Sequence, residues 1–413
     1  MKKLSTQVVI IGAGPSGSIA ASLLHKKGID VRVIEKSVFP RFSIGESLLP
    51  ACMEVIEQAG MTDAVINANF QYKDGAAFRK NGVYTAFNFE NKFSSGPGTT
   101  FQVQRGAFDK VLADTAEAQG VAIDYQHELM GIDFTEDSTV LDVQVLDGER
   151  YQLEAQYVLD GSGFGRVLPK MLNLEEPSSL PPRKAIFTHI NDHIAEADTD
   201  LEYDRNKILI SVHPTNPDVW YWLIPFSNGV SSFGVVGEPK FFESYPQDKI
   251  AAIKQLAMEE PGLAEILAHA EYLSPAGDIG GYSSNVKHLA TDKYALLGNA
   301  GEFLDPVFSS GVTIAMKSAQ LAVECVEKQI NGEKVDWERD YADPLMVGVN
   351  TFRTYVEGWY SGTLQDVIFY QDPNPKIKQM VCSILAGYAW DQTNPYVKNS
   401  QRRLTTLAEI CRS

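Results

Sequence analysis

A pair of tryptophans is the first feature of the sequence that could do chemistry. Trp220 and Trp222 lie in the segment Trp220–Pro225 of a chain that has only five tryptophans in 413 residues. Because successive side chains of a strand point to opposite faces, both indoles fall on the same face. Two indoles on one face could form a wall that limits how far a ligand can enter a site. The alternative is an ordinary buried strand that carries two aromatic residues and ends at a proline.

A glycine-rich turn near the N-terminus is the second such feature. A β-branched apolar strand over residues 7–11 precedes the turn Gly12–Gly17. A helix follows to about residue 27, and a second strand over residues 30–34 ends at Glu35. This order of strand, turn, helix, strand and acid predicts a dinucleotide site, in which the turn approaches the phosphates and Glu35 holds ribose hydroxyls. A purely structural glycine turn is the alternative.

Four later segments indicate that the nucleotide is FAD: Phe39–Pro50, Val103–Asp109, Leu159–Gly163 and Leu297–Ala300. In order, they resemble the cofactor contacts of the FAD-binding fold shared by aromatic hydroxylases, geranylgeranyl reductases and halogenases. Asn299 departs from that pattern, which usually has aspartate there, but a neutral amide can still bond a ribityl hydroxyl. The implied cofactor contacts are Gly12, Gly14, Pro15, Ser16, Gly17, Glu35, Lys36, Arg41, Ser47, Arg105, Asp160, Gly161, Asn299, Gly311 and Val312.

The aromatic segment distinguishes among these flavoproteins. Its Trp-x-Trp-x-Ile-Pro pattern resembles the signature of the flavin-dependent halogenases. The resemblance implies that Trp220 and Trp222 keep the organic substrate away from the flavin, so that hypohalous acid must cross to it. The stretch Lys73–Phe78 resembles the Lys-x-Gly-Ala-x-Phe of phenol- and pyrrole-type halogenases and implies that Lys73 guides the oxidant. An ordinary surface lysine is the alternative there, and Lys80, in a polar turn, is a nearby rival.

The segment Phe303–Thr313 is where the resemblance places the halide. Backbone N–H groups at a helix N-terminus bind anions, and Ser310 and Gly311 are the best placed, although the same donors could hold flavin carbonyls instead. Tryptophan-type halogenases carry a glutamate where this chain has Phe308. The resemblance therefore implies an electron-rich phenol or pyrrole ring, either free or attached to an acyl carrier protein.

Composition limits the partners. The 36 basic and 53 acidic residues give a net charge of −17, which argues against binding to nucleic acid or to an anionic membrane surface. The apolar N-terminal run is broken by glycines, and the sequence shows no membrane span. The four cysteines are scattered, and no metal site is expected at the His189 and His193 pair. These features predict a cytoplasmic protein.

The expected fold class is α/β, with a Rossmann-type FAD-binding domain, an inserted antiparallel-sheet substrate domain and a C-terminal helical region. The expected boundaries are 1–70, 100–175 and 277–331 for the first, 71–99 and 176–276 for the second, and 332–413 for the third. The predicted activity is halogenation by FADH2, O2 and chloride or bromide. No second nucleotide fingerprint is visible, so a separate flavin reductase would supply FADH2. A flavin-dependent aromatic monooxygenase, a geranylgeranyl-reductase-like enzyme and a non-enzymatic flavin-binding scaffold are the alternatives.

Overall fold

A mixed sheet of seven strands forms the part of the fold that contains the glycine-rich turn. The structure is a computed structural model that describes residues 2–413 apart from 137, 198 and 274. Val8–Ile11 are buried in the first strand, as expected for a strand covered on both faces. The strand order is β7 (Ala122–Tyr125), β2 (Val31–Glu35), β1 (Lys2–Ile11), β10 (Arg150–Asp160), β9 (Thr139–Val145) and β8 (His127–Phe134), with β19 (Tyr294–Leu296) also paired to β10.

Helices cover this sheet and carry the cavity-forming loops. The first strand leads through the glycine turn into α1 (Pro15–Lys26), which packs against α4 (Arg105–Ala118) and the long α8 (Ser310–Ile330). Shorter helices lie nearby: α2 (Cys52–Gln58), α3 (Thr62–Asn67) and α5 (Val167–Met171). Because β1, β2 and β10 are parallel, the loops that follow them meet at one edge of the sheet.

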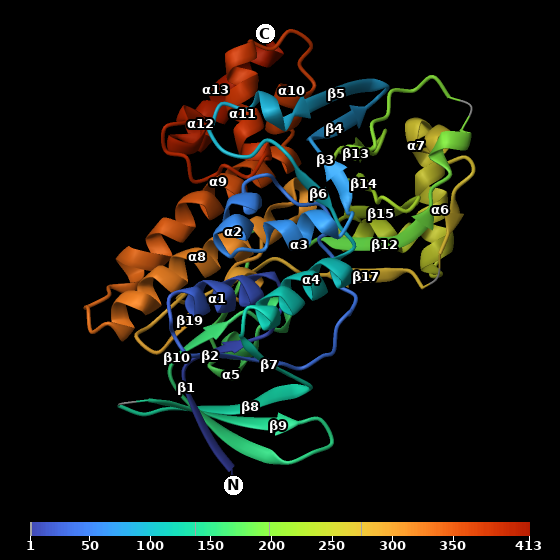
Figure 1. Cartoon of the computed structure of the whole chain (residues 1–413). Coiled ribbons are helices and arrows are strands. Elements are labelled where there is room, and N and C mark those ends of the chain that lie inside the picture. Colours follow the sequence, from blue (N-terminus) through green and yellow to red (C-terminus); the bar gives the residue numbers. More distant parts are fainter. Residues whose placement is uncertain (1, 137, 198, 274) are drawn as a thin grey trace.

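A second, eight-stranded sheet carries the tryptophan pair. Helices α6 (Lys249–Glu259) and α7 (Pro261–Ile266) lie on one side of this sheet (Figure 1). Tyr221 and Leu223 belong to the core on that side, whereas Trp220 and Trp222 pack in the core on the opposite face, as the alternation predicts. Its order is β16 (Glu271–Tyr272), β12 (Lys184–Asn191), β15 (Val230–Gly237), β14 (Trp220–Pro225), β13 (Lys207–Val212), β4 (Gly75–Lys80) and β5 (Val83–Asn88), with β17 (Gly277–Gly280) paired to β12.

This sheet corrects one expectation, because it is not wholly antiparallel. Strands β4 and β13 pair in parallel, from Lys207 beside Gly75 to Ser211 beside Arg79. Parallel neighbours need a long crossover connection. Here residues 81–206 form it, and this stretch includes strands β7 to β10 of the first sheet. Two small antiparallel ladders complete the strands: β3 (Gln71–Lys73) with β6 (Thr100–Gln102), and β11 (Glu175–Pro177) with β18 (Ser284–Val286).

The C-terminal part is helical, as expected. Figure 1 shows these helices in red, at the end of the molecule opposite the N-terminus. They are α9 (Asp343–Tyr360), α10 (Thr363–Ile368), α11 (Pro375–Leu385), α12 (Pro395–Lys398) and α13 (Ser400–Arg412). The predicted fold class is thereby confirmed. Among the described residues, no helix is both long and apolar enough to cross a membrane.

Candidate functional site

A cavity of about 690 Å³ runs between the glycine-rich turn and the tryptophan pair. This size is in the range of small-molecule and cofactor sites. Most of the residues that the sequence singles out line it: Gly12, Gly14, Pro15, Ser16, Glu35, Lys36, Arg41, Ser47, Arg105, Gly161, Trp220, Trp222, Asn299, Gly311 and Val312.

Four singled-out residues do not line this cavity. Gly17 packs inside the turn, where a Cβ would overlap the carbonyl oxygen of Gly12. The buried carboxylate of Asp160 accepts the backbone N–H groups of Ser162 and Leu168, at 2.9 and 2.7 Å. Ser310 is buried at the first turn of α8, and Lys73 lies behind the cavity wall. The structure thus gives Gly17 and Asp160 contacts that hold the turn and the following loop in shape.

The glycine turn forms one end of the cavity, where Gly12, Gly14, Pro15 and Ser16 line it. Gly12 has φ of +89°, and a Cβ there would lie 2.8 Å from the carbonyl oxygen of Gly161. The side chain of Glu35 accepts the backbone N–H groups of Ala13 and Ser37, both at 2.8 Å. The acid at the end of β2 therefore fixes the turn and still lines the cavity.

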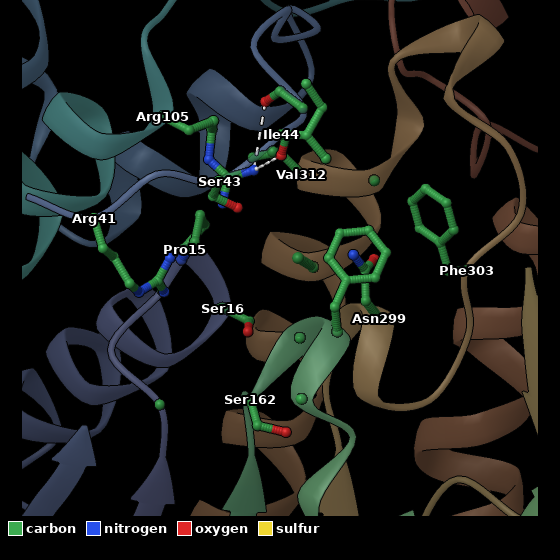
Figure 2. Close-up of a pocket in the computed structure, with 18 of the residues that line it drawn as sticks. Pro15, Ser16, Arg41, Ser43, Ile44, Arg105, Ser162, Asn299, Phe303 and Val312 are labelled. Carbon is green, nitrogen blue, oxygen red and sulfur yellow. Dashed lines mark hydrogen bonds between the residues drawn. The ribbon is translucent and has the colours of Figure 1, made fainter. Parts of the chain in front are cut away.

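Two arginines converge on a shared buried carboxylate beside this turn. The guanidinium of Arg105 donates to Asp109 at 2.8 Å and to the carbonyl oxygen of Ile44 at 2.8 Å, while Arg41 lies 3.4 Å from the same carboxylate. Figure 2 shows both arginines on the Pro15 side of the cavity, across from Asn299. Two guanidinium groups at a glycine-rich turn suit a ligand with phosphate groups.

The two tryptophans form the other end of the cavity, and each indole N–H is bonded. The rings lie 6.0 Å apart, and Nε1 of Trp222 donates to the Ser232 hydroxyl at 3.0 Å. The neighbouring strand has Gly234 opposite Trp222, and any side chain there would overlap the indole. Nε1 of Trp220 donates to the hydroxyl of Tyr360, on α9, at 3.0 Å.

Tyr360 in turn connects Trp220 to the segment before α8. Its hydroxyl donates to Asp305 at 2.9 Å, and the other carboxylate oxygen of Asp305 accepts the N–H of Val307 at 3.0 Å. Burial raises the pKa of Asp305 to about 6, although these hydrogen bonds and the nearby Arg183 oppose the rise. A continuous polar chain therefore fixes the wall relative to the loop that opens α8.

Lys73 is fully buried, which excludes the surface-lysine interpretation. Its Nζ donates to the Ser47 hydroxyl and to the Leu48 carbonyl oxygen, both at 2.7 Å, and lies 5.4 Å from the ring centre of Phe89. Burial lowers the pKa of this amine to about 7. Burial also raises the pKa of the nearby Cys52 thiol, to about 12. Because Ser47 lines the cavity, a single side chain separates the amine from it. The rival Lys80 donates to Gln365 at 2.9 Å instead.

Phe308 and its neighbours show how the segment before α8 is arranged. Phe308 is buried, with edge-to-face contacts to Trp359 and Tyr355 at 6.2 and 6.5 Å between ring centres. Ser309 adopts φ of +57°. Both Ser309 and Gly311 line the cavity. The first turn of α8 therefore presents backbone to the cavity, while the Phe308 side chain packs against the C-terminal helices.

Glu46 and His189 are functional candidates that the sequence analysis did not bring together. Glu46 lines the cavity and its Oε1 lies 2.8 Å from Nε2 of His189. His193, the other half of the histidine pair, bonds instead to Glu196 at 3.0 Å. In the described part of the chain, no group of three or more potential ligands is arranged to hold a metal ion. Glu46 precedes Ser47 in the segment Phe39–Pro50, which the sequence had already indicated as a cofactor contact. This position beside Ser47 was the one sequence signal for Glu46.

Comparisons with known proteins agree with this architecture. A family model described as an FAD binding domain matches residues 5–230. A 1H-pyrrole-2-carbonyl-[peptidyl-carrier protein] chlorinase from Pseudomonas fluorescens is 26% identical, over 97% of this chain and 93% of its own length. The corresponding brominase from Pseudoalteromonas luteoviolacea is 28% identical, over 94% of this chain and 93% of its own length.

Two solved structures are similar over nearly the whole chain. A flavoprotein/dehydrogenase from Cytophaga hutchinsonii is 43% identical, with 99% of both chains covered and a TM-score of 0.94. A flavin-dependent brominase is 24% identical, again with 99% of both chains covered, at a TM-score of 0.84. The second likeness, at that identity, concerns the fold alone.

Proposed function

We propose that this chain, which belongs to the FAD-binding domain family and to its flavin-dependent halogenase branch, halogenates an electron-rich phenol or pyrrole ring. The observation that carries the proposal is the position of Lys73. A buried amine with a depressed pKa stands one side chain away from a cavity that ends in two tryptophans. This arrangement suits an enzyme whose oxidant and organic substrate occupy separate places.

The cavity fits FAD. Gly12 and Gly14 line the cavity without side chains, so a ligand's phosphates can approach the backbone there, close to Arg41 and Arg105. Glu35 would hold the ribose and Asn299 the ribityl chain. When bound and reduced, the flavin would supply two of the four electrons that O2 takes up, and the chloride or bromide would supply the other two as it becomes hypohalous acid. The remaining proposed contacts are Gly12, Gly14, Pro15, Ser16, Lys36, Ser47, Gly161, Gly311 and Val312, while Gly17 and Asp160 would act by shaping the site.

Trp220 and Trp222 would act as the wall. Their indoles fill the end of the cavity, and hydrogen bonds to Tyr360 and Ser232 fix both rings. An aromatic substrate is excluded from this end, whereas a molecule as small as hypohalous acid is not. The halide would bind at the first turn of α8, where the backbone N–H groups of Ser310 and Gly311 combine with the positive end of a 21-residue helix.

Lys73 would receive the oxidant. With a pKa of about 7, the amine is present at neutral pH in both the charged and the neutral form. The ammonium can hydrogen-bond hypohalous acid and polarise its halogen toward the ring. The neutral amine can instead take the halogen, forming an N–X bond and releasing water. Ser47 and Leu48 hold Nζ in place for either route.

The substrate and partners follow from the same proposal. Phe308 stands at the position where tryptophan-type halogenases carry a glutamate, so a ring that loses its proton easily is favoured. The two pyrrole-halogenating relatives act on a ring attached to a peptidyl carrier protein, and we extend that presentation to this chain. A separate flavin reductase would supply FADH2. The three-part division at 1–70, 100–175 and 277–331, 71–99 and 176–276, and 332–413 is part of this proposal.

The relative described as a flavoprotein/dehydrogenase provides a second candidate, a flavin oxidoreductase that uses no halide. One assay separates the two. The protein is supplied with FAD, a flavin reductase, NADH, O2 and bromide, together with an electron-rich phenol or a pyrrole on a carrier protein, and the products are identified by mass spectrometry. Bromide-dependent addition of bromine to the ring is expected. Hydroxylation or dehydrogenation that proceeds equally without bromide would contradict the proposal.

A further inference from the structure

Glu46 and His189 form a buried acid–base pair that the halogenation site does not yet account for. The pair joins the loop after β2 to strand β12, because Glu46 Oε1 and His189 Nε2 lie 2.8 Å apart across 143 positions of sequence. The Glu46 side chain is 1% exposed and that of His189 is 26% exposed. One member of the pair therefore reaches solvent, and the other lines the cavity.

The second carboxylate oxygen of Glu46 is free to act on a ligand. Oε2 is buried and has no hydrogen-bond partner among the described residues. A buried carboxylate oxygen without a partner is costly, so such a group usually has a functional reason. Glu46 lines the cavity, and the next residue along the chain, Ser47, accepts the hydrogen bond from Lys73.

The proposed reaction requires protons inside this cavity. One anionic reduced flavin, one O2, one halide ion and two protons give oxidised flavin, one hypohalous acid and one water. Without halide, the same flavin and O2 consume one proton and give hydrogen peroxide. Either reaction therefore needs a group that delivers protons to the flavin.

We propose that His189 and Glu46 form a proton relay that carries protons from solvent to the flavin cavity. His189 takes up a proton at its exposed edge. The N–H bond at Nε2 then breaks as an O–H bond forms on Glu46, which gives a neutral imidazole and a carboxylic acid. The acid presents its proton to the cavity after rotation about Cγ–Cδ. The relay rests on the proposed function for halide oxidation, and it serves peroxide formation equally.

The surroundings of the imidazole favour its charged form. Burial alone would lower the pKa of His189, but the hydrogen bond and charge of Glu46 outweigh burial and raise it above the ordinary value. Phe42 and Phe226 also lie against the ring, at 6.1 and 5.4 Å between ring centres, and neither titrates. Glu46 therefore favours the protonated form of the imidazole, the form that can pass a proton on.

Two variants and one matched control test the pair. Glu46→Gln keeps the size of the side chain but cannot take the proton, and His189→Gln removes the donor. The control is His193→Gln, which removes a histidine from the exposed His193–Glu196 pair. In holoenzyme with isotope-labelled histidine, NMR titration is expected to show the pKa of His189 falling by about one unit or more in Glu46→Gln. An unchanged His189 titration would overturn the relay.

The kinetic readout is the pH dependence of reduced-flavin oxidation by O2, followed by absorbance with and without bromide. Both relay variants are expected to be slower by about 10- to 100-fold and to lose the wild-type fall in rate at high pH. FAD affinity is measured for each variant and the rates are compared at saturating FAD, while His193→Gln should match wild type. Wild-type rates and pH profiles in both relay variants would contradict the relay. If the wild type forms only peroxide, the halogenase proposal fails, and the relay is still decided by the bromide-free rates.

Discussion

The two ends of the site are built in different ways. At the nucleotide end, residues 7–35 provide a strand, a turn, a helix and an acid within one short stretch of chain, and backbone groups do most of the bonding. At the lysine end, Lys73 lies on a three-residue strand and is held by Ser47, Leu48 and Phe89 from other segments. The first end depends on local geometry, whereas the second depends on burial of a charged group.

The largest expected effect concerns the lysine end. Burial lowers the pKa of Lys73 from 10.5 to about 7, so between these pH values the unfolded chain binds more protons than the native one. The free energy of unfolding of the wild type should therefore rise with pH across this range. Lys73→Met lacks this dependence and is expected to be more stable by about 3–5 kcal/mol at pH 7 or below, with the difference shrinking toward pH 10.5.

Urea-induced unfolding of the apoprotein, measured at several pH values, checks this prediction. Lys80→Met is the matched control, because Lys80 is a nearby lysine that is only partly buried. A difference between wild type and Lys73→Met that stays constant with pH would show that the amine is not desolvated as described.

Two glycine variants separate fold from cofactor binding at the nucleotide end. A Cβ at Gly17 would overlap the Gly12 carbonyl oxygen, so Gly17→Ala should lower the free energy of unfolding of the apoprotein by about 3 kcal/mol. A Cβ at Gly14 would lie 3.5 Å from the mobile end of Arg41, so Gly14→Ala should cost less than about 1 kcal/mol. Because Gly14 lines the cavity, Gly14→Ala should still weaken FAD binding, which calorimetric titration measures. Equal stability of the two variants would contradict the turn geometry.

A moderate loss of stability is expected at the tryptophan wall. Trp220→Phe removes the hydrogen bond to Tyr360 and part of a buried ring, so the free energy of unfolding should fall by about 1–3 kcal/mol. Tyr360→Phe, which leaves both the indole N–H and Asp305 without this partner, tests the same contact from the other side. A double variant whose loss equals the sum of the single losses would show that the two side chains do not interact.

Local patterns predicted much of this molecule. The glycine turn and the burial of the first strand follow from neighbouring residues, and the shared face of Trp220 and Trp222 follows from strand alternation. The resemblance to halogenases rested on short contiguous motifs and is supported by relatives that match most of the chain. Such features are readable because the residues that make them are close in sequence.

Long-range contacts were not predictable in the same way. The parallel pairing of β4 with β13 joins residues more than 130 positions apart, and the Glu46–His189 contact spans 143. Burial of Lys73 depends on Ser47 and Phe89 closing around it, which no local pattern encodes. The assigned roles of the site residues and the domain boundaries stay predictions that only experiments on the protein can decide.

The role of Lys73 in passing the oxidant to the ring is tested most directly by following the oxidant in Lys73→Ala. With FADH2, O2 and bromide supplied, free hypobromous acid is trapped with a small amine while brominated ring is measured in the same reaction. We expect Lys73→Ala to bind FAD and to release oxidant at the wild-type rate, but its rate of ring bromination should fall by about 100-fold or more. Lys80→Ala should match wild type. Ring bromination at the wild-type rate in Lys73→Ala would contradict the proposed role of Lys73.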